Sequence, residues 1–189
     1  AGRLAGESLH LAQEIEALIE AALARNVLGL SAHAQANLAE SRSWFEEALA
    51  LFREVNDRRN IAHTLVGLAR TAYRLDDHRR AQELLEESLA LSRTFGIQWS
   101  LAFSLEIMGL LRRSEGDYGR ALEMFRESLQ LSFEQESRQG IINCLCAIAG
   151  LAATIKQPKI AVRLFAGTER LREEIGNKMG QADQQEYDA

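Results

Sequence analysis

The feature that most constrains the fold of this 189-residue chain is an internal repeat of 40 residues. Three consecutive segments, beginning at Ser41, Ala81 and Ala121, align without a gap. Hydrophobic side chains recur in fixed columns of this alignment: Leu51, Leu91, Leu131 and Leu171 in one, Phe45, Leu85, Phe125 and Phe165 in another, and Leu65, Leu105 and Leu145 in a third. One such unit cannot bury its apolar face alone, so we expect a stack of similar units that share a continuous core.

Each unit has the spacing of two helices joined by a turn. Apolar residues of the first helix recur at helical period and form one core-facing stripe, namely Leu65, Leu68, Ala69, Ala72 and Leu75. Turn-forming residues share one column of the repeat: Asp76-Asp77, Gly116-Asp117 and Gln157-Pro158. Small residues occupy two columns where helix backbones can approach closely, Ala69/Gly109/Ala149 and Ala81/Ala121/Ala161. Since Pro158 is the only proline, we expect an all-α fold of stacked antiparallel helix pairs.

The same register extends to the start of the chain, where residues 7–11 match residues 47–51. We therefore expect the array to cover residues 1–176, with 1–20 as the second helix of an earlier, truncated repeat. Successive helix pairs are expected at 21–60, 61–100, 101–140 and 141–176, and the polar residues 177–189 are expected to form a tail or a short helix. Because the repeat ends are uncovered, we also expect that two copies of the chain can pair through them.

One repeat carries the signature of a known family. The tetratricopeptide spacing is matched by Leu105, Met108-Gly109, Gly116, Tyr118, Ala121 and Phe125. The chain thus resembles the tetratricopeptide repeat proteins, in a subtype with repeats longer than the usual length of about 34 residues. It departs from the family in that Arg112 and Ala72 replace a frequent tyrosine and the usual closing proline is absent. The resemblance implies a right-handed α-solenoid whose first helices line a concave groove for peptides or partner helices.

A narrower resemblance rests on the segments FEEALALFREVNDRRNIAHTLVGLAR and AVRLFAGTERLREEIG, within residues 41–176. They are similar to the carboxy-terminal repeats of bacterial STAND-type ATPases that regulate transcription. In that family the nucleotide switch and the DNA-binding domain lie elsewhere in the chain. The resemblance therefore implies a regulatory or sensor segment that binds a protein or peptide partner, or other domains of its parent chain. Two other functions stay open: a stand-alone adaptor, and a small-molecule sensor or enzyme with a pocket in the groove.

Charge and apolar content argue against two classes of partner. The formal net charge of -5 offers no broad cationic field for a nucleic acid backbone. No apolar run approaches the roughly 18 residues that a bilayer-spanning helix needs. We therefore expect no direct nucleic acid partner, no membrane contact and a cytoplasmic location. The two cysteines, Cys144 and Cys146, point in different directions on a helix and are expected to be buried free thiols.

Motifs for catalysis or cofactor binding are not found in the sequence. No glycine-rich loop ends in GK[ST], and the histidines lack HExxH or cysteine ligands at metal spacing. Acidic pairs such as Glu46-Glu47 and Glu86-Glu87 recur at one repeat position with arginines nearby, as expected for a solvated helix face. We therefore expect that the chain is not an enzyme and has no catalytic residue, cofactor or metal.

The candidate binding site is the groove face of the first helices. Its residues are Asn26, His33, His63, Arg70, Tyr73, Arg74, Phe103, Glu106, Ile107, Arg113 and Asn143. Arginines beside aromatic rings can hold an acidic or aromatic segment, but the same residues also suit an ordinary half-exposed face. Phe103, Ile107 and Leu110 are expected to be exposed apolar positions of this groove. The lysine-and-asparagine clamp that binds chaperone tails in some arrays is not matched, because its positions carry Asn26, Leu30, Gly67, Phe103 and Ile107.

Overall fold

The structure is a computed structural model that describes the backbone of residues 2–174 and the side chains of residues 10–174. The described range contains eight helices and no strand: α1 (Gly2–Ala34), α2 (Leu38–Glu54), α3 (Arg58–Arg74), α4 (His78–Phe95), α5 (Gln98–Ser114), α6 (Tyr118–Glu134), α7 (Arg138–Thr154) and α8 (Pro158–Glu174). The expected all-α fold is therefore confirmed. The polar residues 177–189 lie outside the described residues.

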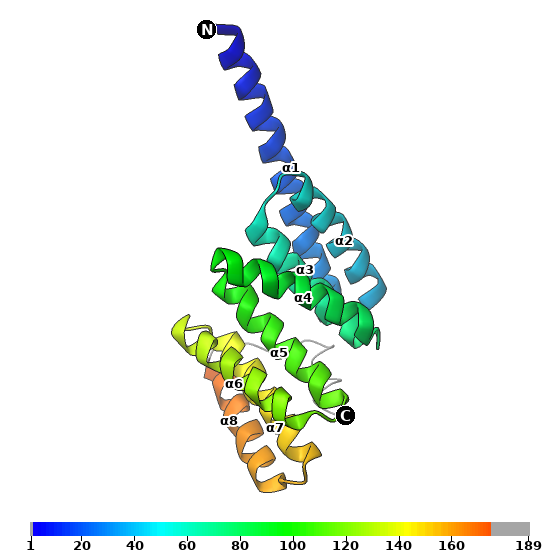
Figure 1. Ribbon diagram of the computed structural model, residues 1–189, viewed down its shortest axis with the longest axis vertical. Coiled ribbons are helices and arrows are strands. Elements are labelled where there is room, and N and C mark those ends of the chain that lie inside the picture. Colours follow the sequence, from blue (N-terminus) through cyan, green and yellow to red (C-terminus); the bar gives the residue numbers. More distant parts are fainter. Residues whose placement is uncertain (1, 175–189) are drawn as a thin grey trace.

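Neighbouring antiparallel helices pack as pairs, α1 with α2, α3 with α4, α5 with α6 and α7 with α8. Figure 1 shows these pairs stacked along the long axis of the molecule. Each second helix also packs on the first helix of the next pair, and the first helices touch in the order α1, α3, α5, α7. The first helices thus form one continuous layer, which is the arrangement of an α-solenoid and leaves their outer side open as a concave surface.

Turns recur every 20 residues, and each contains one residue in the left-handed conformation. These residues are Ala36, Asn56, Asp76, Gly96, Gly116, Glu136 and Lys156, with φ between 53° and 82°. The next helix is often capped by the residue that follows, because Asp57, Asp77, Asp117 and Ser137 each accept a hydrogen bond from a backbone N–H three residues on. Pro158 occupies the first position of α8, where its missing N–H is not needed. The three turns expected from the sequence are confirmed.

The first helix corrects one boundary expected from the sequence. Residues 1–20 were expected to be a separate helix that precedes the pair at 21–60, but Gly2–Ala34 is one continuous helix of 33 residues. The 20-residue spacing would place that turn at Glu16 and Ala17. Both residues favour helix, and Ala17 has no side-chain oxygen to cap a new one. α1 therefore continues, and its amino-terminal half projects beyond the other helices (Figure 1).

The core is built from large side chains seated against glycine or alanine. Phe45 is 1% exposed, and a Cβ atom added to Gly29 or Gly67 would lie within 3 Å of its ring. Phe125 is fully buried against Gly109 in the same way. Where the equivalent first-helix residue is Ala69, the partner is the smaller Leu85, and both are fully buried. Helix spacing in each pair therefore depends on the combined size of the two residues.

Candidate functional site

The concave side of the array holds a cavity of about 120 Å³. Its lining residues come from α1, α3, α5, α7 and α8, and are His33, Arg70, Arg74, Glu106, Leu110, Arg113, Asn143, Cys146, Ala147, Gly150, Phe165 and Arg172. Six of the eleven groove residues expected from the sequence are among them: His33, Arg70, Arg74, Glu106, Arg113 and Asn143. Side chains from all four helix pairs therefore converge on one concavity.

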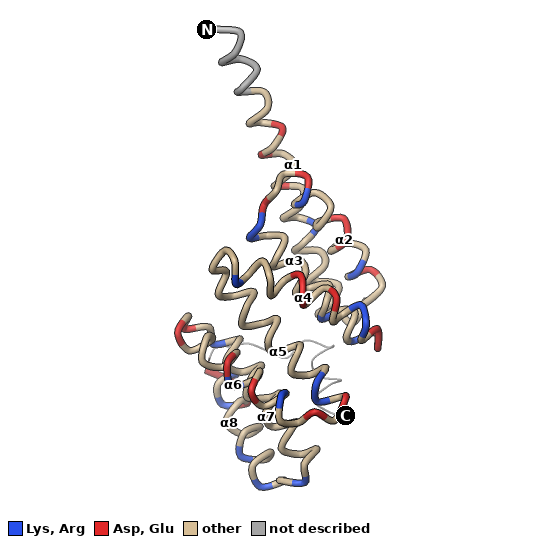
Figure 2. The backbone as a smooth tube through the Cα atoms, viewed as in Figure 1, with Lys and Arg blue, Asp and Glu red and all other residues tan. Residues whose placement is uncertain are grey.

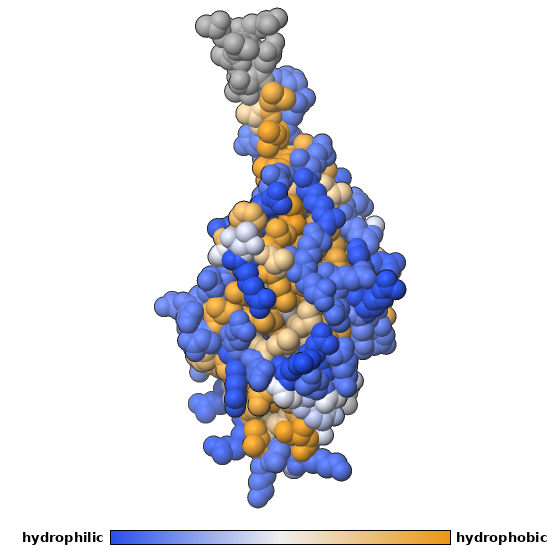
Figure 3. Space-filling view, in the orientation of Figure 1, coloured by the Kyte–Doolittle hydropathy of each residue, from blue (hydrophilic) through white to orange (hydrophobic). Residues whose placement is uncertain are grey.

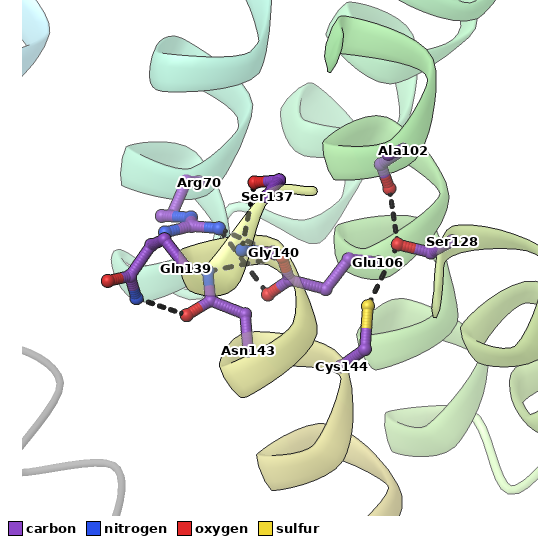
Figure 4. A network of polar contacts seen from close by, with 9 residues as sticks. All are labelled: Arg70, Ala102, Glu106, Ser128, Ser137, Gln139, Gly140, Asn143 and Cys144. Atoms are coloured by element: carbon purple, nitrogen blue, oxygen red, sulfur yellow. Dashed lines mark hydrogen bonds and ion pairs between the residues drawn. The ribbon is translucent and has the colours of Figure 1, made fainter. Parts of the chain in front are cut away.

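A polar network crosses three first helices at the edge of this cavity (Figure 4). Arg70 of α3 lies 3.1 Å from a carboxylate oxygen of Glu106 on α5, whose side chain is 8% exposed. Asn143 of α7 donates to the same carboxylate at 3.4 Å and accepts a hydrogen bond from Gln139 at 2.7 Å. The Arg70 guanidinium also lies 5.6 Å from the centre of the Phe103 ring. These contacts fix Arg70 in position because its charge is paired and its plane is covered.

Positive charge exceeds negative charge around the cavity. Among the described lining residues there are four arginines, whereas Glu106 is the single carboxylate. Arg172 of α8 donates hydrogen bonds to Glu169 on the same helix, at 3.1 Å, and to the Cys146 sulfur on α7, at 3.5 Å. Figure 2 shows acidic and basic residues interspersed along the helices, and the net charge of the whole chain is -5. The positive character is therefore local to the cavity.

Arg113 has a particular place in this lining. No carboxylate among residues 10–174 forms an ion pair with it. Its guanidinium lies so close to Gly150 of α7 that an added Cβ atom would overlap Nη1. The missing side chain at residue 150 thus leaves room for a half-buried cation to lie across α7 at the cavity wall.

The other five expected groove residues do not line the cavity. Asn26 donates to the Thr64 hydroxyl at 3.2 Å and ties α1 to α3. His63 packs edge-on against Trp99, with ring centres 4.6 Å apart, and burial lowers the pKa of its imidazole with Arg59 acting in the same direction. Tyr73 is stacked on His78. These side chains join helices to one another, and they are separate from the cavity.

The expectation that three apolar groove positions are exposed is wrong. Phe103 is 6% exposed, Ile107 is fully buried and Leu110 is 7% exposed. Phe103 is covered by Trp99, whose ring centre lies 4.3 Å away, and belongs with Ile107 to the main core cluster. Leu110 packs in the second cluster, which includes Phe125. The first helices lie too close together to leave these side chains in solvent.

Two cavity residues, Phe165 and Arg172, were not expected from the sequence, because the groove was assigned to first helices and both lie on α8. Phe165 shares a repeat column with the buried Phe45 and Phe125. Those two rings face a glycine, whereas the equivalent position in the last pair is the fully buried Ala149. We attribute the partial exposure of Phe165 to this methyl group, which takes up the space that a ring needs. An alanine opposite a phenylalanine is the sequence signal that was missed.

An exposed apolar stripe on α1 adjoins the cavity. Leu23, Val27 and Leu30 are 43%, 64% and 58% exposed. On the face drawn in Figure 3, hydrophobic atoms run along α1 next to its grey amino-terminal residues. Leu23 and Leu30 lie on the same helix face as His33, which lines the cavity and contacts the Thr71 hydroxyl of α3 at 3.2 Å. The concave surface thus combines a cationic part and an apolar part.

The two cysteines are free thiols, as expected, but only Cys144 is fully buried. Burial, and secondly the nearby Glu106 carboxylate, raise the pKa of the Cys144 thiol to about 12. Burial also raises the pKa of Cys146.

Within residues 10–174 no group of three or more His, Cys, Asp or Glu side chains could hold a metal ion. None of the described helices is long and apolar enough to cross a membrane.

We expect both thiols to resist alkylation in the folded chain. The thiolate is the reactive species, so at pH 8 iodoacetamide should modify Cys144 about a hundredfold or more slowly than free cysteine, and Cys146 should also react more slowly than free cysteine. Modification should be complete within minutes in urea. Mass spectrometry over time gives the rates, and a Cys144→Ser variant assigns the remaining signal to Cys146. Rapid modification of either thiol in the native protein would contradict the burial described here.

Comparisons with known proteins agree with this architecture. Residues 19–94 match the family model of the tetratricopeptide repeat. The apo form of RapI is similar in structure, with a TM-score of 0.67 and 17% identity over 84% of this chain and 58% of the RapI chain. BtubC (BKLC) from P. vanneervenii gives a TM-score of 0.60 and 16% identity over 82% of this chain and 64% of that chain. No curated protein matches the sequence. The expected tetratricopeptide-like solenoid is thus confirmed as the fold, and the chain spans less than two thirds of either similar structure.

Proposed function

We propose that this chain is a protein-interaction scaffold that binds a peptide or protein segment on its concave face. The observation that carries the proposal is the convergence of side chains from four stacked helix pairs on one cavity. Stacked arrays use such concave surfaces for binding, because successive repeats present side chains along one extended wall. The match of residues 19–94 to the tetratricopeptide repeat supports the same function.

We further propose that the chain is the regulatory or sensor segment of a larger bacterial signalling or transcription regulator in the cytoplasm. This part rests on the resemblance of residues 41–176 to the repeats of STAND-type ATPases and on the 40-residue subtype. A partner that binds two or more first helices at once would favour one curvature of the array and so bias the domains attached to it. A nucleotide-binding motif in the same coding region supports this context, whereas a coding region without one favours a stand-alone adaptor.

Selection of binders from a phage-displayed random peptide library tests the scaffold function without knowledge of the natural partner. Enriched peptides are measured against three proteins: the parent chain, a groove variant with Arg74→Glu and Arg113→Glu, and a control variant with Arg93→Glu and Arg126→Glu. The control carries the same charge change at exposed positions of α4 and α6. We expect binding that is retained by the control and lost by the groove variant. No enrichment, or equal binding to all three, would refute a peptide-binding groove at this place.

A small-molecule sensor is the second candidate, because charged groups gather around a defined cavity. Its volume of about 120 Å³ is well below the roughly 300 Å³ at which sites for whole drug-sized ligands begin. The size therefore suits one side chain of a longer ligand better than a complete small molecule. Thermal stabilisation of the chain by a small organic anion, in the absence of any peptide binding, would favour this candidate instead.

A further inference from the structure

The cationic cavity and the apolar stripe on α1 meet at His33. The stripe consists of Leu23, Val27 and Leu30, and His33 is part of the cavity lining. Ten residues of helix separate Leu23 from His33, which is a rise of about 15 Å. An extended peptide covers that distance with about five residues, since it advances about 3.3 Å per residue. A short extended segment can therefore run from the stripe to the edge of the cavity at His33.

We infer that these two parts form one site for an extended peptide in which apolar residues lie on the α1 stripe and one anionic side chain enters the cavity. The inference rests on the proposed peptide-binding function and names the chemistry of the ligand. Single apolar side chains with 43% to 64% exposure are ordinary on a surface, but here three follow each other along one helix and lead to an excess of positive charge. A ligand with both features matches this order.

The charge of the cavity selects an anion. Glu106 is already engaged by Arg70 and Asn143, so it holds Arg70 in place and is turned to internal contacts. Arg113 has no carboxylate partner within residues 10–174, and its position over Gly150 keeps it at the cavity wall. A guanidinium donates two parallel hydrogen bonds to a pair of oxygens. Carboxylates and phosphoryl groups both present such a pair, and an experiment can distinguish them.

Fluorescence anisotropy with three labelled peptides tests the inference on the full chain. The peptides share two leucines and a short spacer, and differ only in the last side chain: glutamate, phosphoserine or glutamine. We expect at least one anionic peptide to bind about tenfold or more tightly than the glutamine peptide, with an affinity that falls as salt rises. The tighter of the two anionic peptides identifies the preferred group. Replacing the two leucines with serine, or introducing Leu23→Ser and Leu30→Ser, should also weaken binding.

Variants locate the anionic contact. The groove variant with Arg74→Glu and Arg113→Glu should lose about tenfold or more in affinity for the anionic peptide, and the control with Arg93→Glu and Arg126→Glu should bind like the parent chain. Gly150→Ala keeps every charge and pushes the Arg113 guanidinium from its place. This variant should bind the anionic peptide severalfold more weakly, and its affinity for the glutamine peptide should change little. Circular dichroism confirms that each variant is folded.

Several outcomes would overturn the inference. If the glutamine peptide binds as tightly as the anionic ones, or if none binds at millimolar concentration, the cavity is not an anion site. The scaffold function would still stand if peptides selected from the library lose binding to the groove variant without needing an anionic side chain. Self-association of the chain that is lost in the groove variant would assign the surface to a second copy and reject a peptide ligand.

Discussion

Phe45→Ala is expected to lower the free energy of unfolding by about 3 to 5 kcal/mol. Phe45 is 1% exposed, and its ring fills the space beside Gly29 of α1 and Gly67 of α3. Its removal opens a cavity where three helices meet, and neither glycine has a side chain that could move into it. Urea unfolding followed by circular dichroism measures the loss. A decrease below about 1 kcal/mol would show that the helices collapse around the gap.

Phe133→Ala is the matched control, because Phe133 on α6 is 57% exposed. We expect a change within about 0.5 kcal/mol for this surface substitution. Hydrogen exchange adds a spatial test, since each repeat contacts only its neighbours. In the Phe45→Ala variant, amide protection should fall most in α1, α2 and α3 and least in α7 and α8. A uniform loss over the whole chain would indicate that the array unfolds as a single cooperative unit.

The fold could be predicted from the sequence because the information is repeated and local. Three hydrophobic columns, two columns of small residues and a turn column fix the helix pairs. The turn at residues 76 and 77 has both a left-handed residue and a capping aspartate. The long first helix could not be predicted from the same register. There the leucine column continues at Leu11, while the turn position is occupied by Glu16 and Ala17. The helix continues through these residues because a turn needs local capping residues, and the periodicity of the repeat alone does not end a helix.

The candidate site could be predicted only in part. Periodicity assigns a residue to a helix face, and this located six of the cavity residues. It cannot determine how closely neighbouring helices approach, which is why Phe103 and Ile107 are buried when exposure was expected. Contacts between first helices, such as His63 of α3 on Trp99 of α5, depend on side chains that lie far apart in the sequence. The contribution of α8 was missed for a similar reason, because it depends on how Phe165 fits against Ala149.

Gly109→Ala is expected to destabilise the chain by about 1 to 3 kcal/mol, although alanine favours helix. The added Cβ atom would lie 2.5 Å from the Phe125 ring, which is fully buried and cannot swing aside. The α5 and α6 backbones must separate to accept it. Gly167 of α8 provides the control, because no described atom outside its own helix backbone lies within 4 Å of its added Cβ. Gly167→Ala should therefore stabilise the chain by up to about 1 kcal/mol.

A second substitution tests whether size complementarity is the cause. The pair Ala69 and Leu85 occupies the same repeat positions as Gly109 and Phe125, and both of its residues are fully buried. A Gly109→Ala and Phe125→Leu double variant reproduces that pair in the third repeat. Its loss of unfolding free energy should therefore be smaller than the sum of the losses in the two single variants by about 1 kcal/mol or more. Thermal and urea unfolding of the four proteins complete the double-mutant cycle. Simple additivity would mean that the contact does not set the helix spacing, and the same explanation for the partly exposed ring of Phe165 beside Ala149 would then fail.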